Sequence, residues 1–267
     1  MKKIGVVGCG TIGTQICLAI DQGKIAAQLV AVADMDGVKA QRLVDRLSNP
    51  CEVLLIPELV RRADLIVEAA TQSVVSSLIE MVLDQGKEIL IMSVGGLLPL
   101  TWVWDRLQDS GGRLYIPSGA IAGLDAVRAA NMARIQSVTL TTRKPPGGLK
   151  GAPYCLEKGI DLGALERETV IFEGSAQEAV RAFPQNINVA ATLSLAGVGP
   201  ERTRVRIIAD PNLKSNIHEI EIVGESGKIV TRTENVPSTF NPKTSYLAVL
   251  SAIAALQGIT SPFKVGA

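Results

Sequence analysis

The sequence has few of the residues on which several common kinds of site depend. Of its 267 residues one is histidine, four are cysteine and 3% are aromatic. The cysteines form no Cys-x-x-Cys pair, so we expect neither a metal site nor a disulfide framework, and a reduced, cytoplasmic protein is the simplest interpretation. The shortage of aromatic side chains argues against stacking platforms for nucleic-acid bases or sugars.

An excess of charge of one sign is also missing. Lys and Arg total 27 and Asp and Glu total 26, so electrostatics gives no reason to expect nucleic acid or an anionic membrane as a partner. The most apolar late segment, residues 246–259, is too short to span a bilayer. Because a strand begins at the first residues, we expect no signal peptide. The length allows one large domain or two modest ones.

The clearest motif lies in the first fourteen residues. An apolar run over residues 4–7 is typical of a buried parallel strand, and a glycine-rich turn and a helical pattern follow directly. This order is the context that the dinucleotide-binding fingerprint G-x-G-x-x-G requires. The first glycine permits a tight turn, the second lets a pyrophosphate approach the backbone, and the third lets helix and strand pack closely. The predicted cofactor contacts in this turn are Gly8, Gly10, Thr11, Ile12 and Gly13.

A carboxylate stands where this fingerprint places one. Asp34 follows a second apolar strand at residues 29–33, and a carboxylate about twenty residues beyond the last glycine holds the ribose hydroxyls of the cofactor. It disfavours a 2′-phosphate because two like charges would meet. No Arg follows directly, so NAD is favoured, although Lys39 leaves NADP open. The alternative is an ordinary strand-end carboxylate or a helix N-cap.

Strands and helices alternate as far as residue 117. Further strands are expected at residues 53–56, 63–70, 88–92 and 114–116, with helices at 38–47, after Pro57, and at 73–85. This alternation predicts a doubly wound parallel sheet, and therefore a Rossmann domain over residues 1–117. Ligands of such sheets lie at the carboxyl ends of the strands. Further cofactor contacts are predicted there, at Ala69, Ala70 and Ser93.

The pattern changes after Pro117. A small-residue turn at residues 118–125 leads into a helix, and strands with a period of two then dominate, at residues 137–143, 203–209, 217–223 and 228–233. We predict a second α+β domain over residues 118–240, with a mainly antiparallel sheet covered on one face by helices at 176–182 and 189–196. A helix at 242–256, within residues 241–267, is expected to return to the first domain. The Pro/Gly loop at 145–148 is a mobile surface segment or a lid.

The single histidine, His218, enters one of these later strands. Histidine suits general acid–base catalysis near neutral pH, and the alternative is a structural hydrogen bond at a strand end. Asn188 opens a helix, where it is either an N-cap or a group that orients a nicotinamide carboxamide or a substrate carboxylate. The cations Arg143, Lys144 and Lys150 flank the Pro/Gly loop, and they either clamp an acidic substrate or are merely solvated.

Several motifs together resemble one family, the L-aspartate dehydrogenases. The matching segments are residues 8–13, 117–125, 141–146, 183–191 and 210–218. The resemblance implies a Rossmann domain followed by a substrate domain that makes a homodimer contact, an active-site histidine at His218, and NAD contacts at Ala120, Ala122 and Asn188. It implies oxidative deamination of L-aspartate through iminoaspartate to oxaloacetate and ammonia, with His218 as base. Because iminoaspartate is also the precursor of quinolinate, it suggests a role in NAD biosynthesis.

Other dehydrogenases are the nearest alternatives. Pro145 and Pro146 after a basic strand end are also similar to homoserine dehydrogenases. A dihydrodipicolinate reductase needs a paired-histidine helix, which a chain with one histidine does not have. Sugar oxidoreductases usually carry a Lys-Pro pair where this chain has residues 93–96. A dinucleotide-sensing protein without turnover would have no evident use for His218.

Overall fold

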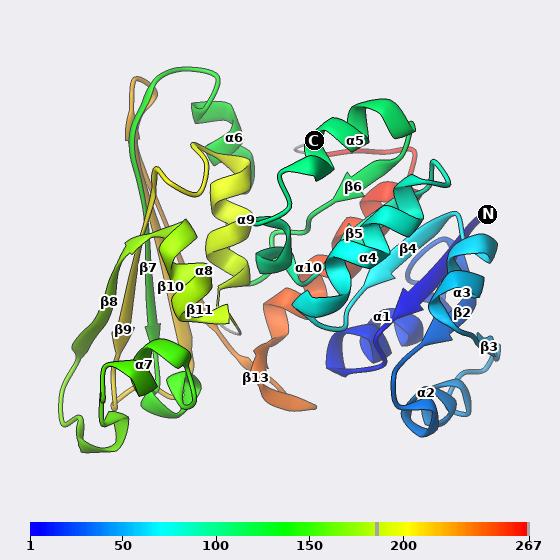
Figure 1. Cartoon of the computed structure of the whole chain (residues 1–267), viewed down its shortest axis with the longest axis horizontal. Coiled ribbons are helices and arrows are strands. Elements are labelled where there is room, and N and C mark those ends of the chain that lie inside the picture. Colours follow the sequence, from blue (N-terminus) through cyan, green and yellow to red (C-terminus); the bar gives the residue numbers. More distant parts are fainter. Residues whose placement is uncertain (185–186, 266–267) are drawn as a thin grey trace. The chain divides into compact units, whose positions relative to one another are not determined.

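The computed structural model describes residues 1–184 and 187–265. The chain divides into two compact units (Figure 1). The first comprises Met1–Pro117 and Val249–Ala267, and the second comprises Ser118–Ala248. Within the described residues no helix is both long enough and apolar enough to cross a membrane.

The first unit contains a six-stranded parallel sheet in the order β3-β2-β1-β4-β5-β6. Its strands are β1 (Lys2–Val7), β2 (Ala27–Ala33), β3 (Glu52–Val53), β4 (Leu65–Glu68), β5 (Glu88–Ile91) and β6 (Arg113–Tyr115). The order reverses between β1 and β4, so this is the doubly wound Rossmann topology that the sequence predicts. The carboxyl ends of β1 and β4 therefore flank the switch point where such sheets bind ligands.

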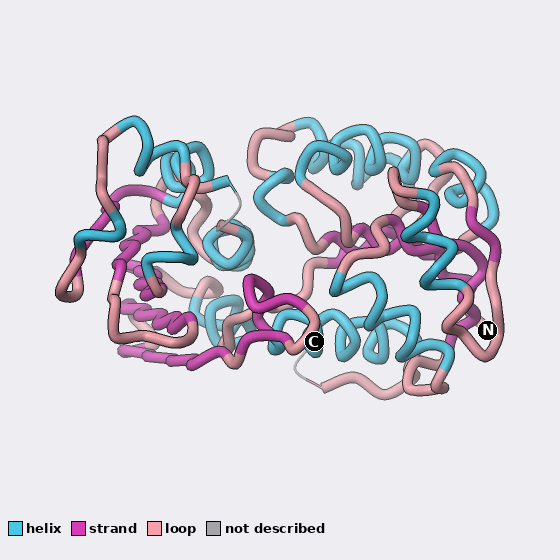
Figure 2. The backbone as a smooth tube through the Cα atoms, turned by 90° about the horizontal axis from the view of Figure 1, so that it is seen from below, coloured by secondary structure: helices cyan, strands magenta, loops and turns pink. Residues whose placement is uncertain are grey.

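Helices cover both faces of this sheet, as Figure 2 shows. They are α1 (Thr11–Asp21), α2 (Gly37–Val44), α3 (Ile56–Arg62), α4 (Gln72–Leu83), α5 (Trp102–Ser110) and α10 (Tyr246–Thr260), with a 3-10 turn at Val94–Leu97. The prediction of a strand through Ile56 was wrong, because Pro57 fixes a helical start and α3 begins there. Helix α5 was not predicted. Val103 is its one buried residue, so it lacks an apolar stripe.

The core of the first unit joins its two chain segments. Ile4 and Val6 of β1 pack in one apolar cluster with Ile16 of α1 and with Ala252 and Leu256 of α10, all without measurable exposure. Gln257 of α10 also donates to the carbonyl of Lys24, at 2.7 Å. The helix at the end of the chain thus belongs to the packing of the first unit.

The second unit contains a five-stranded sheet in the order β11-β10-β7-β9-β8. Its strands are β7 (Ile135–Lys144), β8 (Thr169–Ser175), β9 (Thr203–Ala209), β10 (Asn216–Gly224) and β11 (Gly227–Asn235). Every pair is antiparallel except β7 with β9, so the sheet is mixed but mainly antiparallel. Strand β8 was not predicted. A register shift between Val170 and Phe172 buries Ile171 and Phe172 together and hides the alternation.

Helices α6 (Leu124–Ala130), α8 (Ala176–Ala182) and α9 (Asn188–Ala196) lie on one side of this sheet (Figure 1). Short turns Pro146–Leu149 and Leu162–Ala164 and helix α7 (Pro153–Glu157) complete the unit. The predicted helix at 242–256 begins instead at Tyr246. The preceding residues form strand β13 (Asn241–Ser245), which pairs with β12 (Pro237–Ser238).

Candidate active site

The glycine turn after β1 has the geometry that the fingerprint requires. Gly8 has φ +100°, and a Cβ atom there would lie 2.5 Å from the carbonyl oxygen of Ala69. A Cβ atom at Gly13 would lie 1.8 Å from the carbonyl oxygen of Gly8. Beside Gly10 the nearest atom to such a Cβ is Lys39 Nζ at 3.9 Å, so this side of the turn is open. The turn is therefore tightly packed at Gly8 and Gly13 and open at Gly10, where the pyrophosphate of a dinucleotide approaches the backbone.

The N-terminus of α1 completes this cradle. Gly10 is its N-cap, no side chain caps the helix, and its first turn carries no acidic residue. The first backbone N–H groups of a helix have no intrahelical partner, and the helix dipole favours an anion beside them. Thr11 and Ile12 therefore present their N–H groups where a diphosphate fits.

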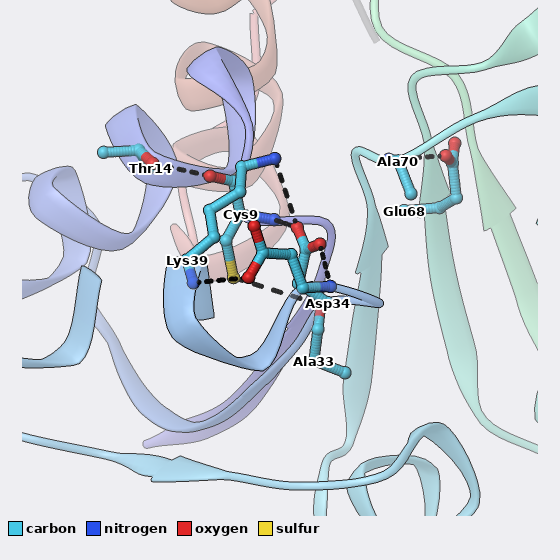
Figure 3. Close-up of polar contacts among 8 residues, drawn as sticks. Cys9, Thr14, Ala33, Asp34, Lys39, Glu68 and Ala70 are labelled. Atoms are coloured by element: carbon cyan, nitrogen blue, oxygen red, sulfur yellow. Dashed lines mark hydrogen bonds and ion pairs between the residues drawn. The ribbon is translucent and has the colours of Figure 1, made fainter. Parts of the chain in front are cut away.

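Asp34 stands at the end of β2, beside the glycine turn (Figure 3). Its carboxylate accepts from the backbone N–H groups of Cys9 (2.7 Å) and Asp36 (3.0 Å), and Lys39 Nζ lies 3.4 Å away. Burial raises the pKa of Asp34, but these hydrogen bonds and the lysine charge outweigh it and hold the pKa below its usual value. The N-cap of α2 is Asp36, so Asp34 does not serve as a helix cap. It is an anion fixed beside the cradle.

Cys9 lies inside the fingerprint, but its thiol is not reactive. It is 3% exposed, and burial together with the charge of Asp34 raises its pKa to about 12. A thiol with this pKa stays protonated and is a poor nucleophile or metal ligand. None of the four cysteines forms a disulfide, and the described residues contain no metal-binding cluster of His, Cys, Asp and Glu.

Glu68 organises the carboxyl ends of β4 and β5, and sequence reasoning missed it. Its side chain has no solvent exposure. It accepts from the N–H groups of Ala70 (2.8 Å), Met92 (3.2 Å) and Ser93 (2.8 Å) and from the Ser93 hydroxyl (2.9 Å). Burial raises its pKa against the opposing effect of these hydrogen bonds. The predicted cofactor contacts Ala69, Ala70 and Ser93 therefore lie on loops that one carboxylate holds.

In the second unit His218 is buried on the helix-covered face of the sheet. It is 4% exposed, and its Nδ1 lies 3.0 Å from the hydroxyl of Thr142, its register partner on β7. Burial, and next the charge of Lys144, lower the pKa of His218 to about 3. The imidazole is thus neutral at neutral pH, and Thr142 orients its ring.

The small-residue turn after Pro117 is attached to the neighbouring strand, β11. The carbonyl of Ala120 accepts from Thr233 Oγ1 (3.0 Å) and Asn235 Nδ2 (3.1 Å), and that of Ala122 accepts from Thr231 Oγ1 (3.1 Å). Thr233 is also the register partner of His218. The structure therefore brings Ala120, distant in sequence, close to the histidine.

Asn188 is the first residue of α9, whose N-cap is Ile187, so the alternative interpretation of Asn188 as the N-cap does not hold. The neighbouring residues 185 and 186 lie outside the described part of the chain. The cofactor contact at Asn188 stays a prediction.

A basic cavity of about 490 Å³ lies at the end of β7 where this strand meets β10. It is lined by Lys144, Lys150 and Lys214, among other residues, and by the Pro/Gly loop. Arg143 does not line it and pairs instead with Glu168, at 3.5 Å. Of the three predicted cations, two therefore border one space, and Lys214 joins them.

We compared the chain with known protein families and structures. A family model described as "Aspartate dehydrogenase, C-terminal" matches residues 125–259, the segment that contains His218 and the basic cavity.

The chain belongs to the L-aspartate dehydrogenase family. An L-aspartate dehydrogenase of Methanosarcina mazei is 51% identical, with both chains covered completely. One from Bradyrhizobium diazoefficiens is 44% identical over 99% of this chain and 94% of its own. The crystal structure of an aspartate dehydrogenase from Thermotoga maritima superposes with a TM-score of 0.75 at 26% identity, covering 99% of each chain.

The first half of this L-aspartate dehydrogenase family member matches a second model. It is described as "Homoserine dehydrogenase, NAD binding domain" and covers residues 8–115. The homoserine alternative is thus supported only where the two kinds of enzyme share a cofactor domain. The glycine cradle and this match agree on a domain for NAD or NADP, as the sequence predicts.

Proposed function

We propose that this chain catalyses the NAD(P)-dependent oxidative deamination of L-aspartate to oxaloacetate and ammonia by way of iminoaspartate. The observation that carries the proposal is similarity over the full length to curated L-aspartate dehydrogenases, at 51% identity. The first unit is the cofactor domain, and the second binds the substrate. The neutral, oriented imidazole of His218 beside a basic cavity supports this assignment.

The cofactor is held by the first unit. Gly8, Gly10, Thr11, Ile12 and Gly13 cradle the diphosphate, and Ala69, Ala70 and Ser93 form the walls at the carboxyl ends of the strands. Ala120, Ala122 and Asn188 are the further cofactor contacts that the family resemblance implies. When bound, the cofactor accepts the hydride that leaves the substrate Cα.

His218 handles the proton. Its neutral imidazole accepts a proton from the substrate amine or from the water that attacks the imine, and the imidazolium returns it in the reverse reaction. The hydrogen bond with Thr142 at Nδ1 leaves Nε2 as the atom that faces the substrate. A carboxylate bound beside Lys144 offsets the charge that lowers the pKa of His218, and so strengthens this base.

Asp34 favours NAD over NADP, because its carboxylate repels a 2′-phosphate while it accepts from the ribose hydroxyls. We expect Asp34→Ala to raise KM for NAD by about tenfold and to leave KM for NADP within about twofold. Initial rates measured with NAD and with NADP give the two KM values and their ratio. An equal loss with both cofactors would remove the ribose role from Asp34.

We also propose a cytoplasmic homodimer that supplies iminoaspartate for NAD biosynthesis. The four free cysteines fit a reducing compartment. The face of the second sheet opposite α6, α8 and α9 carries Arg204, Arg232 and Glu234, which are exposed. Such an open face suits an isologous contact with a second copy. Light scattering of the purified protein tests the dimer.

A panel of amino acids, and of 2-oxo acids with ammonia, tests the activity through nicotinamide absorbance. We expect turnover with aspartate and oxaloacetate alone. The absence of turnover with both aspartate and oxaloacetate would contradict the proposal and favour a dinucleotide-sensing protein. Turnover with homoserine would favour a homoserine dehydrogenase. In the same assay His218→Ala should lower kcat by about 100-fold or more, the usual contribution of a general base. Near-normal turnover of that variant would contradict the role of His218.

A further inference from the structure

We propose that Asn235, at the end of β11, is a positioning residue of the reaction. Its side-chain amide fixes the turn at residues 118–122, which carries the expected cofactor contacts Ala120 and Ala122, relative to His218. The inference rests on the proposed function, because it concerns how the cofactor and the base of that reaction are aligned. Asn235 acts through this turn, and we assign it no step of proton or hydride transfer.

A row of polar side chains on β11 faces the turn. Thr231, Thr233 and Asn235 occupy every second position of the strand, so they share one of its faces. That face is the helix-covered one, because Thr233 is the register partner of the buried His218. All three side chains donate hydrogen bonds to backbone carbonyls of the turn. The strand next to His218 therefore holds the turn through its side chains.

The turn packs closely against this row. Gly123, which directly follows the turn, has φ +86°, and a Cβ atom there would lie 2.7 Å from Thr231 Cγ2. The left-handed conformation and the close approach both favour glycine. Ala120 and Ile121 within the turn are buried. The turn therefore has little room to shift while its hydrogen-bond donors stay in place.

Asn235 differs from the two threonines because both ends of its amide are engaged. Its Nδ2 donates to the carbonyl oxygen of Ala120 at 3.1 Å, and its Oδ1 accepts from the hydroxyl of Ser245 at 2.6 Å. The side chain is 4% exposed, so the loss of either partner leaves a buried polar group unpaired. A neutral amide supplies a donor and an acceptor at once, which a carboxylate does not.

The two bonds of Asn235 lie near the two points at which the chain passes between the units. Ala120 comes shortly after Pro117, where the chain leaves the first unit, and Ser245 comes shortly before Val249, where the chain returns to it. One side chain therefore attaches both passages to the strand next to His218. Loss of its amide should release both segments together.

Asn235→Asp tests this role with a minimal change of shape. A carboxylate cannot donate to the Ala120 carbonyl, so the turn loses this bond and two oxygen atoms repel each other. We expect kcat for aspartate to fall about 30-fold. The Kd of NAD, measured by calorimetry, should change less than about threefold, because the glycine cradle belongs to the first unit. The deuterium isotope effect with aspartate labelled at Cα should increase, because a displaced turn slows cleavage of that C–H bond in particular.

The same variant offers a rescue by pH. Burial raises the pKa of a carboxyl group, and its protonated form can donate a hydrogen bond as the amide does. The ratio of the parent kcat to the variant kcat should therefore shrink as the pH falls, from about 30-fold at pH 8 towards about threefold at pH 5. A ratio that does not change with pH, together with an unchanged isotope effect, would overturn the positioning role.

Asn131→Asp is the matched control. Asn131 also belongs to the second unit, and its Nδ2 donates to the carbonyl of Gly197 at the same distance, 3.1 Å. Its variant should keep the kcat of the parent. Ser245→Ala removes only the second bond of Asn235, so kcat should fall about threefold, and adding it to Asn235→Asp should cause little further loss. Fully additive losses would contradict a shared attachment.

Hydrogen–deuterium exchange distinguishes failure of this role from failure of the proposed function, because it needs no turnover. In Asn235→Asp the peptides covering residues 118–123 and 245–248 should exchange about tenfold faster than in the parent, and in Asn131→Asp they should not change. Faster exchange supports the attachment even in a protein that does not oxidise aspartate, and unchanged exchange overturns the proposal. Faster exchange with a normal kcat for aspartate would keep the function and refute the positioning role. If Asn235→Asp fails to fold, the half-buried Ser245→Ala decides by the same measurements.

Discussion

Glu68 and Lys144 occupy equivalent places in the two units. Each is the last residue of a central strand, and each is a charged side chain removed from solvent. Their surroundings differ. Glu68 is enclosed by three backbone N–H groups and one hydroxyl. Lys144 borders a cavity together with two further cations.

This difference separates a charge enclosed by hydrogen-bond donors from a charge on the wall of a cavity. A buried carboxylate whose acceptor sites are filled by backbone donors fixes those segments in place. A buried ammonium group loses hydration, and burial lowers the pKa of Lys144 accordingly. We therefore expect the first unit to lose stability, and the second to gain it, when the respective charge is removed.

The largest effect is expected from Glu68→Gln. The amide places donor hydrogens where the carboxylate accepts, so at least one N–H among Ala70, Met92 and Ser93 is left unpaired. This should lower the free energy of unfolding by about 3 kcal/mol. Movement of both loops should also raise KM for NAD by about tenfold. Denaturant unfolding and initial rates measure the two effects, with exposed Glu58→Gln as control. Unchanged values would show that the loops hold their position without Glu68.

The acid stability of the protein should depend on His218. The unfolded state takes up a proton near pH 6.5, whereas the folded state does so only near pH 3. Between these values the unfolded state binds more protons, so stability falls as pH falls. At pH 4 the loss from this one group is about 3 kcal/mol relative to pH 7. Thermal unfolding of His218→Asn should show a flatter pH dependence. An identical slope would mean that His218 takes up its proton normally in the folded state.

Lys144→Met should stabilise the protein, because burial disfavours the charged form of this lysine. Methionine has a similar length and no charge to bury, so we expect a gain of about 2 kcal/mol at pH 7. The unfolded state binds more protons between pH 8 and 10.5, so the stability of the parent rises with pH in that window. The advantage of the variant should therefore shrink by pH 10. A loss of stability at pH 7 would remove the distinction between Lys144 and Glu68.

Thr142→Val should have the smallest effect. The two side chains have the same shape, and the change removes one buried hydrogen bond to His218 at a cost of about 1 kcal/mol. Without this partner the imidazole ring is less well oriented, so kcat should fall severalfold while KM for aspartate changes little. The kcat–pH profile separates this from a purely structural role, which would leave it unchanged.

The fold of the first domain could be predicted because it depends on short segments. Each strand–helix unit of the first domain has its own periodicity, and the glycine turn, Asp34 and their spacing lie within one such unit. The failures have local causes too. A bulge hides the alternation of β8, and β13 precedes α10 because its partner β12 is nearby.

The contacts within the candidate site could not be predicted from such local patterns. Thr142 and His218 meet across 76 residues of sequence, and Glu68 joins Ala70 to Ser93, which lies 25 residues away. Lys214 joins Lys144 only through the meeting of β7 with β10. Such pairings are set by register, which the sequence pattern of one strand does not define.

Helix α10 has a consequence for how the protein is made. Ala252 and Leu256 are fully enclosed in the apolar cluster of the first unit, yet a ribosome adds them only after the whole of Ser118–Ala248. Synthesis of the cofactor domain therefore begins before that of the second unit and ends after it. While the second unit is synthesised, the apolar surface of α1 that α10 later covers stays exposed. Chaperone binding to nascent chains should be strongest in that interval, since exposed apolar surface is what such partners recognise.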